Sequence, residues 1–91
     1  MNDAAKLAVL KQDLQRLTNA NDDYLRILLN LAASEIQTEG IKLTDNIESD
    51  MAVIQYAAYL FRKRAGTETA MPRFLRWQLN NMLFSQKGKA T

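Results

Sequence analysis

Apolar residues recur at intervals of three and four along nearly the whole chain, and this spacing constrains the fold more than any other feature. It is the repeat of an α-helix, whereas a half-buried strand alternates every two residues. Helix breakers are scarce, since the 91 residues include one proline and three glycines. The sequence therefore predicts an all-α protein, a small four-helix orthogonal bundle with room for an extra short turn.

The chain is expected to form one domain over residues 1–85 with a flexible polar tail over 86–91, because chains of this length rarely divide their core. The first predicted helix, about 3–17, carries one narrow stripe made of Leu7, Leu10, Leu14 and Leu17. The second predicted helix, about 22–39, ends at Gly40, a residue suited to the left-handed turn that closes a helix.

Acidic residues mark the starts of the second and third predicted helices. Asn21 or Asp22 can cap the second, and the carboxylates in its first turn, Asp22 and Asp23, complement the helix dipole. Asp45 and Glu48 have the spacing of a capping pair for the third. The third helix is apolar almost all round between Met51 and Phe61, which is typical of a central helix.

The fourth predicted helix begins at Pro72, whose missing amide suits a first turn, and runs to about Ser85. It carries two apolar stripes: one contains Leu75, Leu79, Met82 and Leu83, and the other contains Phe74, Trp77 and Phe84. A helix at the edge of a small domain needs one stripe for its own core, so the second stripe requires another neighbour. That neighbour is either another chain or the leucine stripe of the first helix.

Charge divides the chain into two halves. Nine acidic and five basic residues precede Met51, whereas seven basic residues and one acidic residue follow from there. Five of the later bases form a candidate basic surface: Arg62, Lys63, Arg64, Arg73 and Arg76. This division suits subunits that stack acidic side to basic side, or a surface that binds nucleic acid, unless the charges mix in space on folding.

The residue types argue against catalysis. The chain has no histidine and no cysteine, which excludes imidazole and thiolate metal ligands and the Cys/His and Ser/His nucleophile arrangements. The remaining carboxylate candidates, Asp22 with Asp23 and Glu48 with Asp50, sit at predicted helix starts. We therefore expect no enzyme, metal or cofactor.

We also expect no membrane span and no secretion signal, because apolar runs are short and no basic cluster precedes one.

The order of these features resembles the phage head-tail connector family, small adaptors that complete the head beneath the portal. The resemblance covers about residues 4–84. Its elements are Leu10-Lys11, Asn21-Asp22-Asp23, the stretch Leu28 to Ile36 with Ala32-Ala33, the helix end from Tyr59 to Arg64, and Pro72. The second helix departs from the family by ending in Glu39-Gly40, where an aromatic residue is expected.

The resemblance implies a viral structural protein of the virion neck, synthesised in the bacterial host cytoplasm. Many copies would form a ring on the portal protein, bind the next stopper or tail connector, and surround the channel, with passive contact to double-stranded DNA. It implies no catalytic residues and no cofactor. It places contact with the portal or a neighbouring subunit at Phe74, Trp77, Phe84 and Lys87.

Two other functions fit the sequence. The first is a small helical protein that binds nucleic acid through the basic second half, although Phe, Trp and Met on the fourth helix suit base reading poorly. The second is a cytosolic adaptor for a partner helix.

Overall fold

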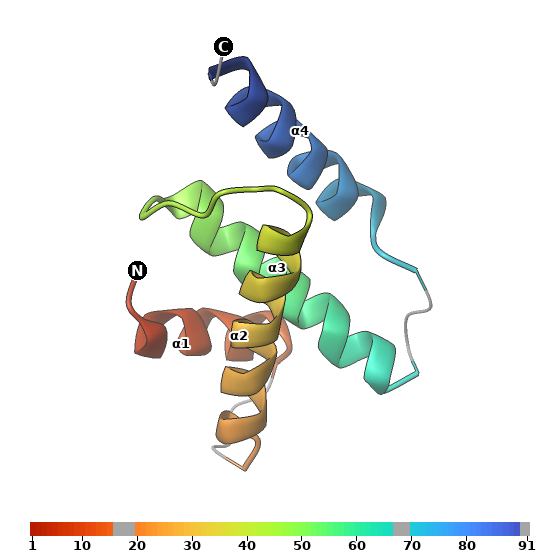
Figure 1. Ribbon diagram of the computed structural model, residues 1–91. Coiled ribbons are helices and arrows are strands. Elements are labelled where there is room, and N and C mark those ends of the chain that lie inside the picture. The colour runs from red at the N-terminus through yellow and green to blue at the C-terminus, as the bar shows by residue number, and fades with distance from the viewer. Residues whose placement is uncertain (16–19, 67–69, 90–91) are drawn as a thin grey trace.

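The computed structural model describes residues 1–15, 20–66 and 70–89 (Figure 1). It contains four helices: α1 (Asp3–Asp13), α2 (Asp22–Thr38), α3 (Ile47–Arg64) and α4 (Arg73–Lys89). Within the described ranges no residue is in a strand. The predicted all-α, four-helix class is confirmed.

Helix α1 is short because its ends are fixed locally. The side chain of Asn2 accepts a hydrogen bond from the Ala5 amide at 2.7 Å and caps its start. The chain leaves the helix after Asp13, and Gln15 takes a left-handed conformation with φ of 58°. Leu7 and Leu10 of the predicted stripe are buried and Leu14 is half-buried, whereas Leu17 lies outside the described residues.

Helix α2 follows the predicted pattern closely. Its first turn holds both carboxylates, Asp22 and Asp23, and Asn21 occupies the capping position without a side-chain capping bond. Gly40 follows its end with φ of 94°, the left-handed conformation that the sequence predicts. The buried residues of α2 recur at helical spacing along one side of the helix: Leu25, Leu28, Leu29, Ala32 and Ile36.

The predicted capping pair of α3, Asp45 with Glu48, is wrong. Asn46 is the cap, and its side chain accepts a hydrogen bond from the Ser49 amide at 2.8 Å. The Thr44 amide donates to the Ser49 hydroxyl at 3.1 Å and fixes the turn that leads into the helix. Because Asn46 has the extended backbone that a cap needs, the helix begins one residue later than an Asp45 cap would require.

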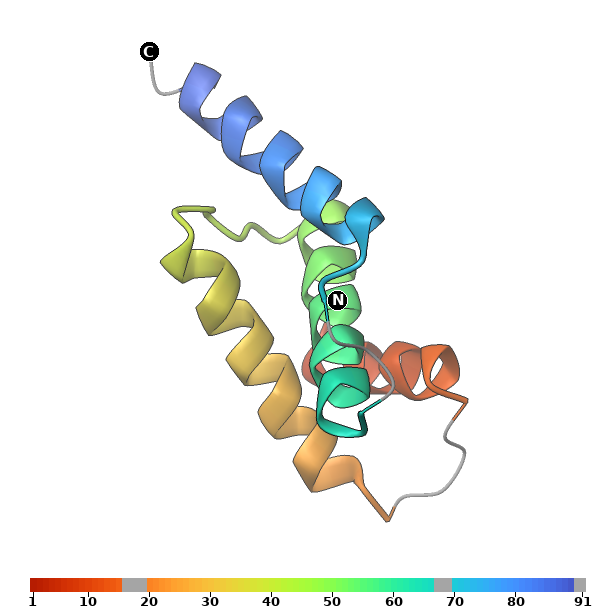
Figure 2. The ribbon, with the colours of Figure 1, turned by 90° about the vertical axis from the view of Figure 1, so that its right-hand side faces the viewer.

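Helix α3 is the centre of the fold, because it contacts each of the other three helices. It is buried over most of its length: Ser49, Asp50, Ala52, Val53, Ile54, Tyr56, Ala57, Ala58 and Tyr59. Helix α1 packs against α2 and α3 at one end of the molecule, and α4 lies at the opposite end in both Figure 1 and Figure 2. The molecule measures 46 × 29 × 18 Å along its principal axes.

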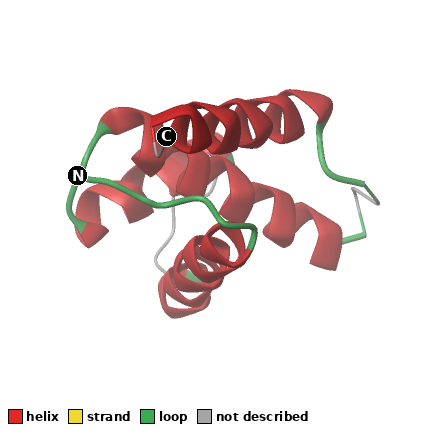
Figure 3. Cartoon of the chain, turned by 45° about the horizontal axis from the view of Figure 1, so that its top comes forward, coloured by secondary structure: helices red, strands yellow, loops and turns green. Residues whose placement is uncertain are grey.

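Helix α4 is attached more sparsely than the other helices. Its main helical neighbour is α3, and Figure 3 shows it along one border of the fold. It also continues to Lys89, through part of the tail that the sequence placed after Ser85. No helix breaker intervenes before Gly88, and Gln86 is held by contacts described below. Ala90 and Thr91 lie outside the described residues.

Candidate docking face on helix α4

One side of α4 completes the core. Leu75, Leu79 and Met82 are buried and Leu83 is half-buried, all packed against the core cluster. These are the four residues of the first predicted stripe. Their burial confirms that this stripe belongs to the subunit's own interior.

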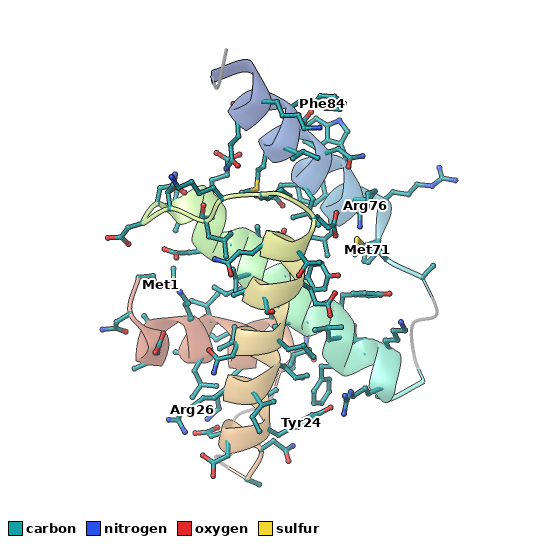
Figure 4. The ribbon with its side chains drawn as sticks, viewed as in Figure 1. Met1, Tyr24, Arg26, Met71, Arg76 and Phe84 are labelled. Atoms are coloured by element: carbon teal, nitrogen blue, oxygen red, sulfur yellow. The ribbon has the colours of Figure 1, made fainter. Side chains whose placement is uncertain are left out.

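The other side of α4 is exposed and aromatic. Phe74, Trp77 and Phe84 keep 63%, 62% and 71% of their surface exposed, and we call these three residues the aromatic face. The rings of Phe74 and Trp77 lie 6.2 Å apart, so they form one continuous surface. In Figure 4, Phe84 stands on the outer side of α4. Large apolar side chains gathered in this way typically mark an interaction site.

The first helix does not cover this face. Helix α1 packs on α2 and α3, and buries Leu7 and Leu10 there. The alternative in which the two apolar stripes of the sequence satisfy each other is therefore wrong. Among the residues that the structure describes, Leu7, Leu10 and Leu14 pack into the core of the first three helices, and the aromatic face is left without a cover.

Two polar contacts fix the orientation of α4. The Arg76 guanidinium donates two hydrogen bonds to the Glu39 carboxylate at the end of α2, at 2.6 and 3.2 Å. These bonds raise the pKa of Arg76. Near the other end of α4, Gln86 pairs with the backbone of Lys42: the Lys42 amide donates to Gln86 Oε1 at 2.7 Å, and Gln86 Nε2 donates to the Lys42 carbonyl at 2.6 Å. We call these two contacts the α4 clamps.

Glycine at position 40 allows the turn that leads to this arrangement. A Cβ atom there would lie 3.6 Å from Leu83 Cδ1, which is ordinary packing distance. The chain needs glycine here for its left-handed backbone, not for space. The turn brings the extended residues 41–44 beside α4, where Lys42 meets Gln86.

The aromatic face lies between positive charges. Helix α4 has no acidic residue, and Arg73 and Lys87 are both exposed, one near each end of the face. The exposed neighbours Asn80 and Asn81 are uncharged. Of the four residues that the resemblance assigns to the interface, Phe74, Trp77, Phe84 and Lys87, all are exposed and all lie on α4.

The candidate basic surface is divided among several neighbours. Arg62 forms an ion pair with Asp13 at 3.3 Å, and Arg76 is bound to Glu39. Lys63 lies over the Tyr59 ring at 5.9 Å, and Arg64 lies over the Tyr24 ring at 6.0 Å. Arg73 is exposed on α4. The last turn of α3 therefore directs its cations toward different elements, and two of the five bases pair with acids of the first half of the chain.

The candidate carboxylates also form separate ion pairs. Asp22 pairs with Lys11 at 3.0 Å and Asp23 with Arg26 at 3.1 Å. Asp50 is buried and accepts a hydrogen bond from the Met1 amine at 3.1 Å, with the Lys6 ammonium 3.7 Å away. Its hydrogen bond raises the pKa of the Met1 amine. Over the described part of the chain, no three acidic side chains gather in an arrangement that could hold a metal ion.

Sequence reasoning missed the role of Asp50. The signal available was an acid in the first turn of an otherwise apolar helix, and the sequence placed it only at a predicted helix start. Its burial depends on α1, whose start brings Met1 and Lys6 to it from 49 and 44 residues away in sequence. No local pattern encodes that contact.

Two cavities adjoin α4. One of about 180 Å³ lies beside Phe74 and is lined by Gln55, Tyr59 and Arg62 among others. A larger open groove of about 380 Å³ runs between the second half of α4 and residues 42–49.

Over the ranges that the structure covers, no helix combines the length and apolarity needed to cross a membrane.

Comparison of the chain with protein-family models, curated proteins and solved structures finds no match.

Proposed function

We propose that this protein is a non-catalytic assembly subunit that docks on other protein subunits through the aromatic face of α4. Following the resemblance of its sequence, we propose that the assembly is a phage head-tail connector. In this role the protein would form a ring under the portal, complete the DNA-filled head and receive the next stopper or tail protein. The observation that supports docking is the exposure of Phe74, Trp77 and Phe84 on one side of a single helix.

The energetics favour an assembly with several contacts per subunit. Complete burial of a large apolar side chain contributes roughly 1.5 to 3 kcal/mol. Because about two thirds of each aromatic side chain is still exposed, covering all three recovers roughly 3 to 6 kcal/mol. Association costs about 4 to 15 kcal/mol. One aromatic contact therefore gives weak binding at best. In a closed ring or on a multivalent portal each subunit makes several contacts, so the cost of association is offset by more than one contact.

The basic residues support this role better than direct recognition of nucleic acid. Arg62 and Arg76 are already paired with carboxylates, and the five bases are divided between the last turn of α3 and the first turn of α4. Affinity for DNA grows with the number of phosphates neutralised, so divided bases bind DNA weakly. Contact with DNA in the proposed channel is accordingly passive.

The proposal is tested with purified protein and purified portal rings of the same virus. Light scattering coupled to size-exclusion chromatography, and electron microscopy, are applied to the protein alone and to the mixture. We expect a collar of added density on the portal and a matching increase in mass. Trp77→Ala should remove both, whereas Ile47→Ala, which deletes an equally exposed apolar side chain on α3, should leave both unchanged.

Two outcomes oppose the proposal. One is a wild-type protein that fails to associate with portal rings at any concentration tested. The other is a collar that forms equally well with Trp77→Ala, since docking would then use a surface other than the aromatic face. Circular dichroism of each variant establishes that the fold is retained.

A further inference from the structure

Helix α2 carries a second partly exposed apolar stripe. Tyr24, Ile27 and Leu31 follow one another at intervals of three and four, so they share one side of the helix. Ile27 is 61% exposed, and Tyr24 and Leu31 are half-buried. Asp23 and Glu35 are exposed near the two ends of this stripe; Asp23 pairs with Arg26 of the same helix at 3.1 Å, and Arg64 of α3 lies over the Tyr24 ring. We call Asp23, Tyr24, Ile27, Leu31 and Glu35 the α2 face.

The α2 face complements the aromatic face in charge and in length. Its apolar side chains lie between two acids, whereas those of α4 lie between Arg73 and Lys87. At 1.5 Å per residue, the acids of α2 are roughly 18 Å apart along the helix and the bases of α4 roughly 21 Å apart. A helix pair with these spacings can set Glu35 against a base at one end of the apolar contact, and at the other end a base of α4 can compete with Arg26 for Asp23.

Within the described part of one subunit the α2 face and the aromatic face do not pack on each other, so their pairing requires a second copy of the chain. Both faces are exposed in the single subunit, and α4 packs mainly on α3 through its other side. Pairing of two aromatic faces about a two-fold axis is less favourable, because it would set Arg73 of one copy near Lys87 of the other.

We propose that the aromatic face of α4 docks on the α2 face of a second copy. This inference rests on the proposed function, since it takes the aromatic face to be a protein-docking surface, and it specifies the partner surface. Because the two faces differ, the contact is head-to-tail. Each subunit then uses both faces and has two neighbours, so the contact generates a ring or an open chain.

The test uses two variants that each remove one face. Trp77→Ala removes the centre of the aromatic face, and Ile27→Lys places a cation in the α2 face. Each variant alone should self-associate at least about 10-fold more weakly than the wild type in sedimentation velocity. An equimolar mixture should form a one-to-one complex that grows no further, because each variant retains the face that the other lacks. Ile47→Lys, which adds the same charge at a similarly exposed isoleucine outside both faces, should behave as the wild type.

Several results would overturn the inference. A wild-type protein that stays monomeric at all concentrations contradicts it, as does normal self-association of Ile27→Lys. Assembly that is lost in Trp77→Ala and not restored by mixing indicates a two-fold contact between aromatic faces. If the wild type does not self-associate but binds phosphatidylserine vesicles or duplex DNA, and Trp77→Ala abolishes that binding, the aromatic face serves another ligand.

The inference and the proposed function fail separately. If Ile27→Lys self-associates normally and Trp77→Ala still fails to bind portal rings, the α2 face is wrong and docking through α4 stands. If Trp77→Ala binds portal rings normally but loses self-association that mixing restores, the portal role of the face is wrong and the head-to-tail contact stands.

Discussion

At the scale of single residues, the buried carboxylate of Asp50 shows how a charge is accommodated inside a small helical core. A buried charge destabilises a fold unless partners satisfy it. Asp50 meets two cations, the Met1 amine and the Lys6 ammonium, and both come from the start of α1. The contact therefore ties the beginning of α1 to the first turn of α3.

This contact predicts a pH dependence of stability for the protein with its α-amino group free. The hydrogen bond to Asp50 raises the pKa of the Met1 amine above 8.0, so the folded state holds this proton more tightly than the unfolded state. Its stabilising contribution is complete below pH 8 and is lost as the pH rises through the folded-state pKa. Thermal unfolding followed by circular dichroism should give a melting temperature that falls as the pH rises above about 8.

Asp50→Asn should lower the melting temperature at pH 7 and flatten this decline. Asp3→Asn, at an exposed acid at the start of α1, is the control and should preserve the wild-type slope. An unchanged slope in Asp50→Asn would show that the amine does not depend on this carboxylate. Tyr56, whose pKa burial raises above 10, adds to the decline only at more alkaline pH.

At the scale of elements, α4 is the helix that depends most on specific polar contacts. The apolar spacing in its sequence predicted its existence and its buried side. The α4 clamps were not predictable in the same way, because Arg76 meets Glu39 across 37 residues and Gln86 meets Lys42 across 44.

The N-terminal cap of α3 was wrongly predicted for a different reason. Thr44, Asp45 and Asn46 are all suitable caps, and the tertiary turn selects among them.

Loosening the clamps should release α4 before the rest of the fold. Glu39→Gln should lower the free energy of unfolding by roughly 0.5 to 1 kcal/mol, because the ion pair is partly solvent-exposed. Gln86→Ala should lower it by roughly 1 kcal/mol. In both variants, amide hydrogen exchange should accelerate in α4 more than in α3. Gln37→Ala, at an exposed position of α2, serves as the control, and equal acceleration in α3 and α4 would show that the clamps do not act on α4 specifically.

At the scale of the whole molecule, the structure combines a core of α1, α2 and α3 with a fourth helix that contributes one side to the core and leaves the other exposed. The two stripes in its sequence predicted that division, because a helix has only one side toward its own domain. The division of charge was less informative. Two ion pairs join the two halves of the chain within one subunit: Arg62 with Asp13, and Arg76 with Glu39. Part of the charge difference between the halves is therefore already neutralised.

The remaining charge should make assembly sensitive to salt. The Debye length is about 3 Å at 1 M salt and about 30 Å at 0.01 M, so exposed charges at the ends of the two faces are screened at high salt. Self-association measured by sedimentation should weaken as NaCl is raised to about 1 M. Association that is independent of salt would show that Arg73, Lys87 and their acidic counterparts do not contribute.

The central claim is that the aromatic face is covered by another protein when the subunit is assembled, and the chain contains its own reporter. Trp77 is the only tryptophan and lies on that face. Its fluorescence can be quenched with acrylamide in the dilute subunit and in the assembled or portal-bound form. The account predicts efficient quenching and red-shifted emission in the free subunit, and protection with a blue shift on assembly. A tryptophan that remains equally quenched and red-shifted in the assembled form would contradict it.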